Sequence, residues 1–211
     1  MILSQIKSWV SMYNKDFWNE RYVSEEYIYG KEPNEFLHSR LPNIKKGKIL
    51  FPCEGEGRNA VFAASLGWDV FAFDQSEAGR QKAIQLAKEK NVTFHYEISD
   101  ALTYPYAPEQ MDMVALIYSH FHKSIRTTVH RNCVRTLKPG GLLLLEGFSP
   151  EQLKYTSGGP KDPDMLYQLK DLRMDFSEMN VEYEETLETE LNESPFHRGK
   201  ASIVRIVLRK I

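Results

Sequence analysis

Apolar runs and helix-like segments alternate along the first two thirds of the chain. Short apolar runs at residues 49–51, 68–73, 92–98, 111–118 and 142–145 have the length and composition of buried strands. The segments between them at residues 58–66, 76–90 and 123–137 have the spacing of helices, with Ser76 as an N-cap and Gly67 as a stop. This alternation predicts a doubly wound α/β fold with a mostly parallel sheet.

The last third of the chain has a different pattern. After a glycine- and proline-rich loop, Asp164 is expected to cap a short helix over residues 165–175. Residues 181–191 and 201–209 then alternate between apolar and polar positions, which predicts an antiparallel hairpin and a sheet of seven strands. Acidic residues fill one side of the first run, as in a solvated edge strand: Glu182, Glu184, Glu188 and Glu190.

Residues 1–45 precede the first core strand and are rich in aromatic residues. A helix is expected over residues 2–13, and a second is expected to start at Pro33 and to end at Leu41 before Pro42. The aromatic residues fit either a cap that buries its rings on the sheet edge or a lid whose rings, Trp18 and Tyr29 among them, face a bound cation. We therefore expect a cap or lid segment at 1–45 and a main unit at 46–211, within one compact domain.

Composition narrows the classes of function. The chain has 211 residues, 42% of them hydrophobic, and a formal net charge of −2, which gives no basic surface for nucleic acid. No apolar run approaches the roughly 20 residues that a membrane-spanning helix needs, and no signal peptide is evident. Cys53 and Cys133 form neither a metal motif nor a disulfide framework. These features indicate a reduced, cytoplasmic protein.

The segment from Ile49 to Asp74 carries the strongest functional signal. Gly55 and Gly57 follow the first strand, where a backbone without Cβ atoms can approach a ligand closely. Asp74 ends the next strand, about 20 residues further on, where a carboxylate can accept hydrogen bonds from a ribose diol. The unit is therefore expected to hold a nucleoside-containing ligand, although a purely structural crossover has the same outline.

The charge of the glycine loop discriminates between nucleoside ligands. The loose dinucleotide pattern is present, but Glu54 and Glu56 flank Gly55, and Arg58 offsets only one of them. A pyrophosphate would meet two carboxylates at short range, whereas S-adenosylmethionine carries a sulfonium and an ammonium. Asp100 follows the third strand, where it can accept the adenine amine or simply form a turn. The candidate cofactor-binding residues are Glu54, Gly55, Gly57, Arg58, Asp74, Gln75, Asp100, Ala101, Trp18 and Tyr29.

Three motifs together resemble the class I S-adenosylmethionine-dependent methyltransferases. They are EGEGRN at residues 54–59, the acid Asp74 and the turn KPGG at residues 138–141, and that family also ends in an antiparallel hairpin. The segments FWNERY at 17–22, YIYGKEPNEFL at 27–37, GGPKDPDMLY at 158–167 and HRGKA at 197–201 are similar to bacterial tellurite-resistance and thiopurine methyltransferases. The resemblance covers nearly the whole chain and implies a seven-stranded, Rossmann-like sheet with S-adenosylmethionine as cofactor.

Two positions depart from that family's first motif. Phe51 stands where the family has an acid that often binds the methionine ammonium, and Cys53 stands at the first glycine. Glu54 is a candidate to take the place of the missing acid. The contacts of the amino-acid end of the cofactor are thus the part of the site that the resemblance leaves open.

Candidates for handling the methyl acceptor lie at strand ends and loops. Tyr118 and His120 follow the fourth strand, at the edge where open α/β sheets bind ligands, and His120 is either a general base or a neutral histidine filling a strand end. Lys161 and Asp162 lie in a loop that either closes over a substrate or merely crosses the surface. The resemblance places His197 and Arg198, in the expected hairpin loop, on the substrate side. His120, His122 and His130 lack the spacing of a zinc site, so no metal is expected.

Methyl transfer from a sulfonium needs an acceptor held in line about 3–3.5 Å from the methyl carbon, in a dry site. The leading hypothesis is an enzyme that methylates sulfur, selenium, tellurium, oxygen or nitrogen of a small molecule, as a monomer or homodimer. A non-catalytic binding module is the alternative, and a nicotinamide-dependent oxidoreductase comes third. Residues 118–121 lack the Asn-Pro-Pro-aromatic motif of nucleic-acid methyltransferases.

Overall fold

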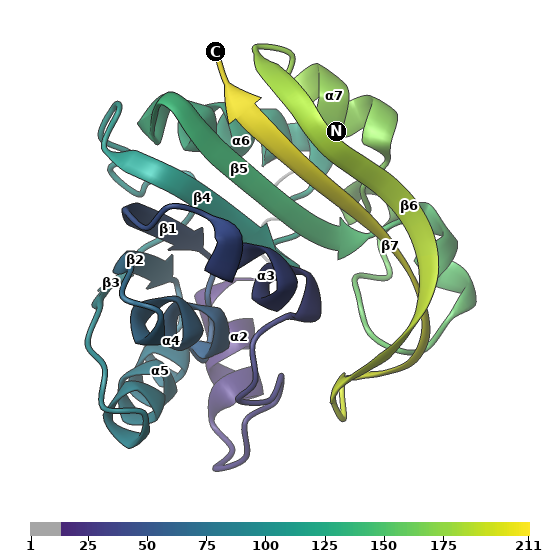
Figure 1. Cartoon of the computed structure of the whole chain (residues 1–211). Coiled ribbons are helices and arrows are strands. Elements are labelled where there is room, and N and C mark those ends of the chain that lie inside the picture. The colour runs from purple at the N-terminus through teal and green to yellow at the C-terminus, as the bar shows by residue number, and fades with distance from the viewer. Residues whose placement is uncertain (1–13) are drawn as a thin grey trace.

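The computed structural model describes residues 14–211, so the helix predicted over residues 2–13 lies outside the described part (Figure 1). Seven strands form one sheet in the order β3-β2-β1-β4-β5-β7-β6. The first five strands run parallel, and β7 is antiparallel to both β5 and β6, as predicted. The strands are β1 Lys48–Pro52, β2 Asp69–Asp74, β3 His95–Ile98, β4 Met111–Ile117, β5 Leu137–Phe148, β6 Met179–Ser194 and β7 His197–Lys210.

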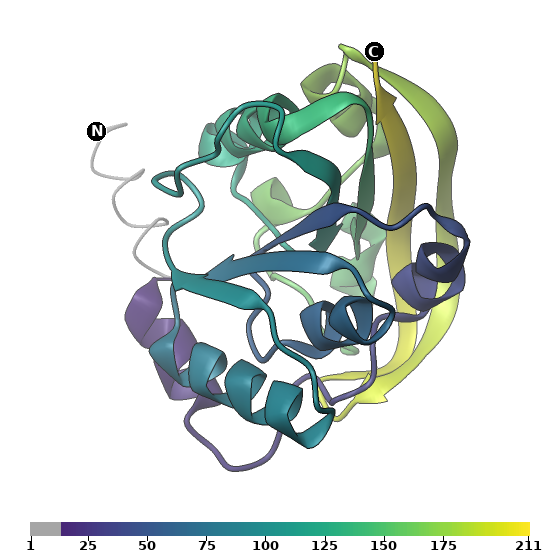
Figure 2. The same cartoon turned by 60° about the vertical axis from the view of Figure 1, so that its left-hand side comes forward.

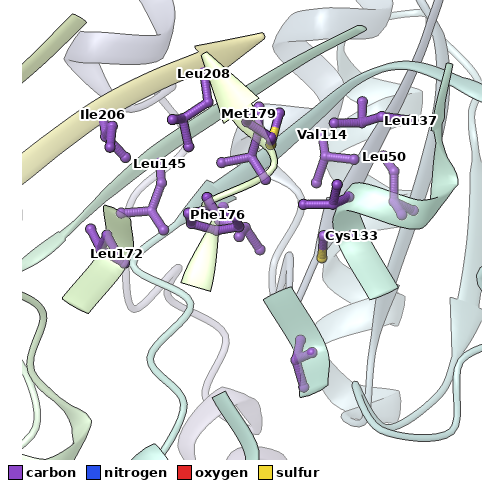
Figure 3. Packing of buried hydrophobic residues seen from close by; sticks show 14 of the residues in the cluster. Leu50, Val114, Cys133, Leu137, Leu145, Leu172, Phe176, Met179, Ile206 and Leu208 are labelled. Atoms are coloured by element: carbon purple, nitrogen blue, oxygen red, sulfur yellow. The ribbon is translucent and has the colours of Figure 1, made fainter. Parts of the chain in front are cut away.

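Helices cover both faces of the sheet. One face buries side chains of α6 and α7 against the middle strands in a cluster that includes Cys133 of α6 and Leu172 of α7, together with Phe176 just after α7 (Figure 3). The other face buries residues of α3, α4 and α5. Figure 2 shows α2 and α5 side by side below the sheet edge. The helices are α2 Lys15–Tyr22, α3 Glu35–Arg40, α4 Arg58–Ser65, α5 Glu77–Glu89, α6 Lys123–Thr136 and α7 Leu169–Asp175, with short 3-10 turns η1 Leu41–Asn43, η2 Pro150–Lys154 and η3 Pro163–Met165.

Local sequence explains where the core elements begin and end. The Ser76 hydroxyl accepts a hydrogen bond from the Gly79 N–H at 3.0 Å and caps α5, as predicted. Gly57 starts α4 with φ +89°, and a Cβ there would lie 2.6 Å from the Ala83 Cβ. Glycine at this turn therefore allows α4 and α5 to pack closely behind the loop that follows β1.

The region after β5 differs from the sequence-based prediction. Asp164 does not cap a helix; Asp162 caps η3 by accepting from the Asp164 N–H at 2.9 Å, and α7 begins only at Leu169. The extended stretch between these elements buries Tyr167 completely and lets its N–H donate to the Phe148 carbonyl at 2.9 Å. Burial of this aromatic ring outweighs continuation of the helix.

Other boundaries shift in smaller ways. The predicted third strand starts at His95 rather than Val92, and KPGG lies within β5, which already pairs with β4 at Leu137. His197 and Arg198 start β7 instead of lying in the hairpin loop. Among residues 14–211, no helix combines the length and the apolar character needed to cross a membrane.

Strand β6 forms one edge of the sheet, as its acidic pattern predicted (Figure 1). Its carboxylates are partly neutralised, since Glu184 pairs with Arg173 and Glu182 pairs with Arg209. Exposed pairs of this kind contribute little to stability, so their main effect is to keep the edge polar.

A buried ion cluster fastens α7 to α6. Asp175 accepts hydrogen bonds from Arg126 Nε at 2.7 Å, Thr127 Oγ1 at 2.8 Å and His130 Nδ1 at 2.9 Å. Burial favours the neutral acid, but the hydrogen bonds from His130, Thr127 and Arg126 lower the pKa of Asp175 to about 2. The carboxylate therefore stabilises the fold above the ordinary aspartate pKa, and this contribution is lost as the pH falls through about 2.

We expect Asp175→Asn to reduce the free energy of unfolding by about 3–5 kcal/mol at pH 7, because it leaves the buried Arg126 without its counterion. Asp171→Asn on the same helix removes an acid with no such partners and serves as the control. Denaturant unfolding at pH 7 measures both variants, and an equal small loss for the two would contradict the structural role of the cluster.

Candidate functional site

A cavity of about 670 Å³ opens at the carboxyl ends of β1, β2 and β4. Its walls come from the loop after β1, the ends of β2 and β4, helix α2, the loop after η2 and the turn of the β6–β7 hairpin. Open parallel sheets bind ligands at this edge. Most of the predicted site residues line this cavity: Trp18, Tyr29, Glu54, Arg58, Asp74, Gln75, Asp100, Ala101, Tyr118, His120, Lys161, Asp162 and His197. Gly55 and Gly57 were also predicted to bind the cofactor but do not line the cavity, because Gly55 packs against Tyr22 and Gly57 packs against Ala83.

The loop after β1 is shaped by left-handed backbone and by one inward carboxylate. Gly55 has φ +62°, and Cys53, at the position of a glycine in related motifs, has φ +56°. Glu54 Oε1 accepts from the N–H groups of Asn59 at 2.8 Å and Ala60 at 2.7 Å, and so caps α4. Burial raises the pKa of Glu54 to about 7, against these hydrogen bonds and the charge of Arg58.

The charges of this loop are balanced differently from the sequence-based expectation. Glu56 pairs with Lys82 at 2.8 Å and accepts from the N–H groups of Ile28 and Tyr29, which holds the N-terminal segment on the loop. Arg58 Nη2 pairs with Glu193 on β6 at 3.0 Å rather than with Glu54 or Glu56. The expectation that Arg58 offsets a loop carboxylate directly was therefore incomplete, because its partner comes from the far end of the chain.

Asp74 lies at the tip of β2 and is buried. Its Oδ2 accepts from the Gly55 N–H at 3.1 Å, and its Oδ1 accepts from the Ser76 N–H at 2.9 Å. Burial raises the pKa of Asp74 to about 6, although the hydrogen bonds from Ser76, Gly55 and Gln75 oppose this rise. A carboxylate has about four acceptor positions, so with these three hydrogen bonds Asp74 keeps capacity for one further donor. Asp100 is exposed and accepts from the Leu102 N–H at 2.8 Å, so it also forms the turn that the sequence allowed.

Aromatic side chains of the N-terminal segment close one side of the cavity. Trp18 stacks on Tyr22 with ring centroids 5.5 Å apart, and Tyr22 meets Tyr29 edge to face at 6.2 Å. The guanidinium of Arg21 lies 5.2 Å from the ring of Phe196 in the hairpin turn. The segment thus both packs on the core and covers the cavity, which combines the cap and lid interpretations.

The geometry around His120 does not support its predicted role as a base. His120 Nδ1 lies 2.8 Å from the Met165 carbonyl oxygen, which only accepts, so this nitrogen carries the proton. His120 Nε2 accepts from the Phe148 N–H at 3.1 Å, so its lone pair is occupied. Burial lowers the pKa of His120 to about 4. His120 is therefore a neutral histidine that fills the strand end and ties three segments together.

His197 has the geometry that His120 lacks. Its Nδ1 lies 3.1 Å from Glu193 Oε2, and its ring meets Tyr118 edge to face at 4.5 Å. Burial opposes ionisation of Glu193, but the hydrogen bond from His197 and the charge of Arg58 lower its pKa to about 2. Glu193 is thus ionised and His197 Nδ1 donates to it, which leaves Nε2 as the basic nitrogen of the ring at the cavity wall.

The loop from Ser157 to Asp164 packs directly on this histidine. A Cβ on Gly158, which has φ +119°, would lie 2.8 Å from His197 Cδ2. Lys161 is exposed and donates to the Tyr155 carbonyl at 3.4 Å, while Asp162 is engaged in capping η3. Arg198 is exposed and does not line the cavity, so the structure does not bring it to the site as predicted, because strand alternation turns it away from His197.

Glu193 is a site residue that the sequence does not distinguish from its acidic neighbours. It follows a run of alternating glutamates and looks like another solvated acid, but a register shift between Asn192 and Ser194 marks a bulge at this position. A bulge re-aims one side chain, and here it turns Glu193 inward to Arg58 and His197. Within residues 14–211, no group of three His, Cys, Asp or Glu side chains is arranged to hold a metal ion.

Comparison with known proteins agrees with the fold and the loop. A family model described as a methyltransferase domain matches residues 49–141. The chain is 31% identical over 121 residues to the methyltransferase GfsG of Streptomyces halstedii, which covers 55% of this chain and 43% of that protein. The chain thus matches less than half the length of that curated relative.

Solved structures share the architecture over most of the chain. A protein studied for the conversion of a disulfide bond into a thioacetal group during echinomycin biosynthesis has a TM-score of 0.76 at 15% identity, covering 95% of this chain and 91% of that one. TehB from Haemophilus influenzae has a TM-score of 0.69 at 16% identity, covering 93% and 67%. A methyltransferase from Methanosarcina mazei has a TM-score of 0.64 at 16% identity, covering 85% and 99%.

We expect the imidazole of His120 to stay neutral, with its proton on Nδ1, from pH 8 down to about pH 5, because burial lowers its pKa to about 4. Two-bond ¹H–¹⁵N NMR spectra across this range report the tautomer and the charge, and His120→Gln assigns the resonance. A midpoint above pH 6 would contradict the proposed fixed hydrogen bonds.

Proposed function

This chain has the class I S-adenosylmethionine-dependent methyltransferase fold, and we propose that it is an enzyme that methylates a small molecule. The observation that carries the proposal is Asp74, which lies at the tip of β2 in the cavity beside the glycine loop. The methyltransferase domain match at residues 49–141 contains both the loop and this acid. The proposal includes a cytoplasmic location, which the composition favours.

The residues present fit the cofactor. The remaining acceptor capacity of Asp74 suits a hydroxyl of a ribose, and Asp100 and Ala101 line the cavity next to it after β3. The cavity volume of about 670 Å³ lies in the range of cofactor and ligand sites. When bound, S-adenosylmethionine supplies an electrophilic methyl group on a sulfonium. The chain's own residues orient the ligands and exclude water.

A nicotinamide dinucleotide fits this loop poorly. The pyrophosphate of a dinucleotide binds the free N–H groups at the start of the helix after the first strand. Here Glu54 Oε1 already accepts from Asn59 and Ala60, which are two of those groups. A phosphate would have to displace the Glu54 carboxylate and would be repelled by its negative charge. The geometry therefore favours a cationic cofactor over a nicotinamide dinucleotide.

The departures at Phe51 and Cys53 do not favour a non-catalytic module. Cys53 adopts φ +56°, so the loop keeps the left-handed conformation that a glycine would have. Phe51 is fully buried in the core beneath the loop. Both substitutions therefore preserve the shape of the loop and change only which side chains meet the ligand.

The acceptor half of the cavity is mostly aromatic and apolar. Tyr118 stacks on Phe148 at 4.8 Å, and Phe121, Met165 and Phe196 line the same space. Such walls suit a compact, partly apolar acceptor that is held by packing and by a few polar contacts. We propose a small molecule with a sulfur, oxygen or nitrogen nucleophile, and the apolar walls suit it better than a chalcogen oxyanion.

His197 is the residue best placed to take a proton from the acceptor. Glu193 fixes its tautomer by accepting from Nδ1, so that Nε2 holds a lone pair at the cavity wall. Burial and Arg58 lower the pKa of His197, so the ring is neutral and basic at pH 7. A positioned base of this kind matters for phenols and amines and is not needed for an acceptor that is already ionised.

Calorimetric titration tests the cofactor. We expect S-adenosylmethionine and S-adenosylhomocysteine to bind and NAD not to bind. Asp74→Asn should weaken both adenosyl ligands roughly 10- to 100-fold, because hydrogen bonds to a charged group contribute about 1.5–3 kcal/mol. Asp69→Asn, at the opposite end of β2, is the control. Binding of NAD alone would contradict the methyltransferase proposal and favour an oxidoreductase.

A comparison of two acceptors tests His197. We expect His197→Gln to lower kcat/KM about 10²- to 10⁴-fold for a phenol and to change it little for an aryl thiolate that is ionised at the assay pH. His38→Gln, on the exposed side of α3, is the control. Equal losses for both acceptors would mean that His197 only shapes the cavity.

A further inference from the structure

The cationic side chains on the wall of the cavity differ in whether they are paired. Arg21, Arg58 and Lys161 all line it, and Arg58 is paired with Glu193. Within residues 14–211, no carboxylate forms an ion pair with Arg21 or with Lys161, whose ammonium donates only to the Tyr155 carbonyl at 3.4 Å. A guanidinium that faces a ligand cavity without an acid of its own can bind an anionic group of the ligand.

Two aromatic rings hold the guanidinium of Arg21 in place. Its Cζ lies 5.2 Å from the centroid of the Phe17 ring, one turn earlier on α2, and 5.2 Å from the centroid of the Phe196 ring in the turn of the β6–β7 hairpin. Arg21 is also partly buried. Aromatic faces attract the cation but do not neutralise it, and the N–H groups at the edge of a guanidinium that lies over a ring stay available to a carboxylate.

A continuous stretch of cavity wall joins Arg21 to His197. Phe196 precedes His197 in the chain, and the Tyr29 ring lies 6.4 Å from Phe196 and 4.9 Å from His197. All four residues line the cavity. An acceptor can therefore place its nucleophile at His197 Nε2, lay its apolar body against the rings and extend its other end to Arg21.

The acids of the cavity do not neutralise Arg21, because each is engaged by other donors. Asp162 accepts from the Asp164 N–H and caps η3. The other acids lie at the glycine loop or at the ends of β2 and β3, where each accepts from backbone N–H groups: Glu54, Glu56, Asp74 and Asp100. An anionic group of a ligand is thus favoured at Arg21 and disfavoured at the glycine loop.

We propose that the methyl acceptor carries a carboxylate and that Arg21 binds this group. The assignment rests on the proposed function and adds the charge of the substrate class to it. A carboxylate on a planar apolar body suits both the guanidinium and the aromatic wall, and Arg21 determines specificity at the end of the acceptor remote from the nucleophile. Lys161 is exposed and attracts the same charge without fixing its position.

Calorimetric titration of the complex with S-adenosylhomocysteine tests the assignment without requiring turnover. The probes are 4-hydroxybenzoate and 4-hydroxycinnamate, which differ in length, and the amide of each, which has a similar shape without the charge. We expect the acid of better-fitting length to bind roughly 10-fold more tightly than its amide. Arg21→Met should remove this preference and change the affinity of the amide less than about 2-fold, whereas Arg21→Lys should keep part of the preference.

Two further variants complete the test. Phe196→Leu keeps the charge of Arg21 but removes one ring that holds it, so it should weaken the acid roughly 2- to 5-fold and the amide less. This variant and Arg21→Lys keep the test decisive if Arg21→Met fails to fold. Arg131→Met, which removes an exposed arginine of α6 outside the cavity, is the matched control.

The outcomes separate this assignment from the proposed function. Acids that bind no better than their amides, no binding of either class, or a preference that survives Arg21→Met overturns the carboxylate assignment while the cofactor stands. Failure of S-adenosylhomocysteine itself to bind the unaltered protein contradicts the proposed function instead.

Discussion

The rest of the site depends on the carboxylate of Glu193, because it holds three parts of the chain together. It accepts from Arg58 at the start of α4, from His197 on β7 and from Asn34 at the start of α3, within 3.0–3.1 Å. Asn34 in turn donates to Glu146 at 2.6 Å, and Glu146 pairs with Arg205 at 2.6 Å. Because these charges are buried, each one needs its partner, and the glycine loop, the hairpin and the N-terminal segment are held in one arrangement.

Most of the fold follows from the spacing of apolar residues in the sequence and from the residues that cap or end helices. The apolar runs of β1, β2, β4 and β5 and the cap at Ser76 are local signals, and the structure confirms them. The failures have non-local causes. Helix α7 starts late because the Tyr167 N–H donates to the Phe148 carbonyl and the ring is buried, and the fifth strand starts early because Leu137 already pairs with Met111. Neither partner is visible from a window of neighbouring residues.

The site residues also fall into those that the local sequence predicts and those that depend on distant contacts. Asp74 and the glycine loop could be predicted because one strand, turn and helix bring them together within 26 residues. The roles of His120 and His197 could not be assigned, since each depends on what its two ring nitrogens contact. Met165 and Phe148 occupy both nitrogens of His120, whereas Glu193 occupies one nitrogen of His197 and comes from a bulge hidden in an acidic strand.

Phe51 stands where the resembling family has an acid in β1, and its surroundings explain why an apolar residue suits this position. Phe51 is fully buried among apolar side chains of the sheet and of helices α3 and α4, where an ionised carboxylate would be costly. Glu54 lies before α4, where the N–H groups of Asn59 and Ala60 donate to it and oppose the effect of burial, which raises its pKa to about 7. The chain therefore departs from the resembling family in the side chains at residues 51 and 53 while Cys53 and Gly55 keep the left-handed backbone of the loop, whose Gly55 N–H donates to Asp74.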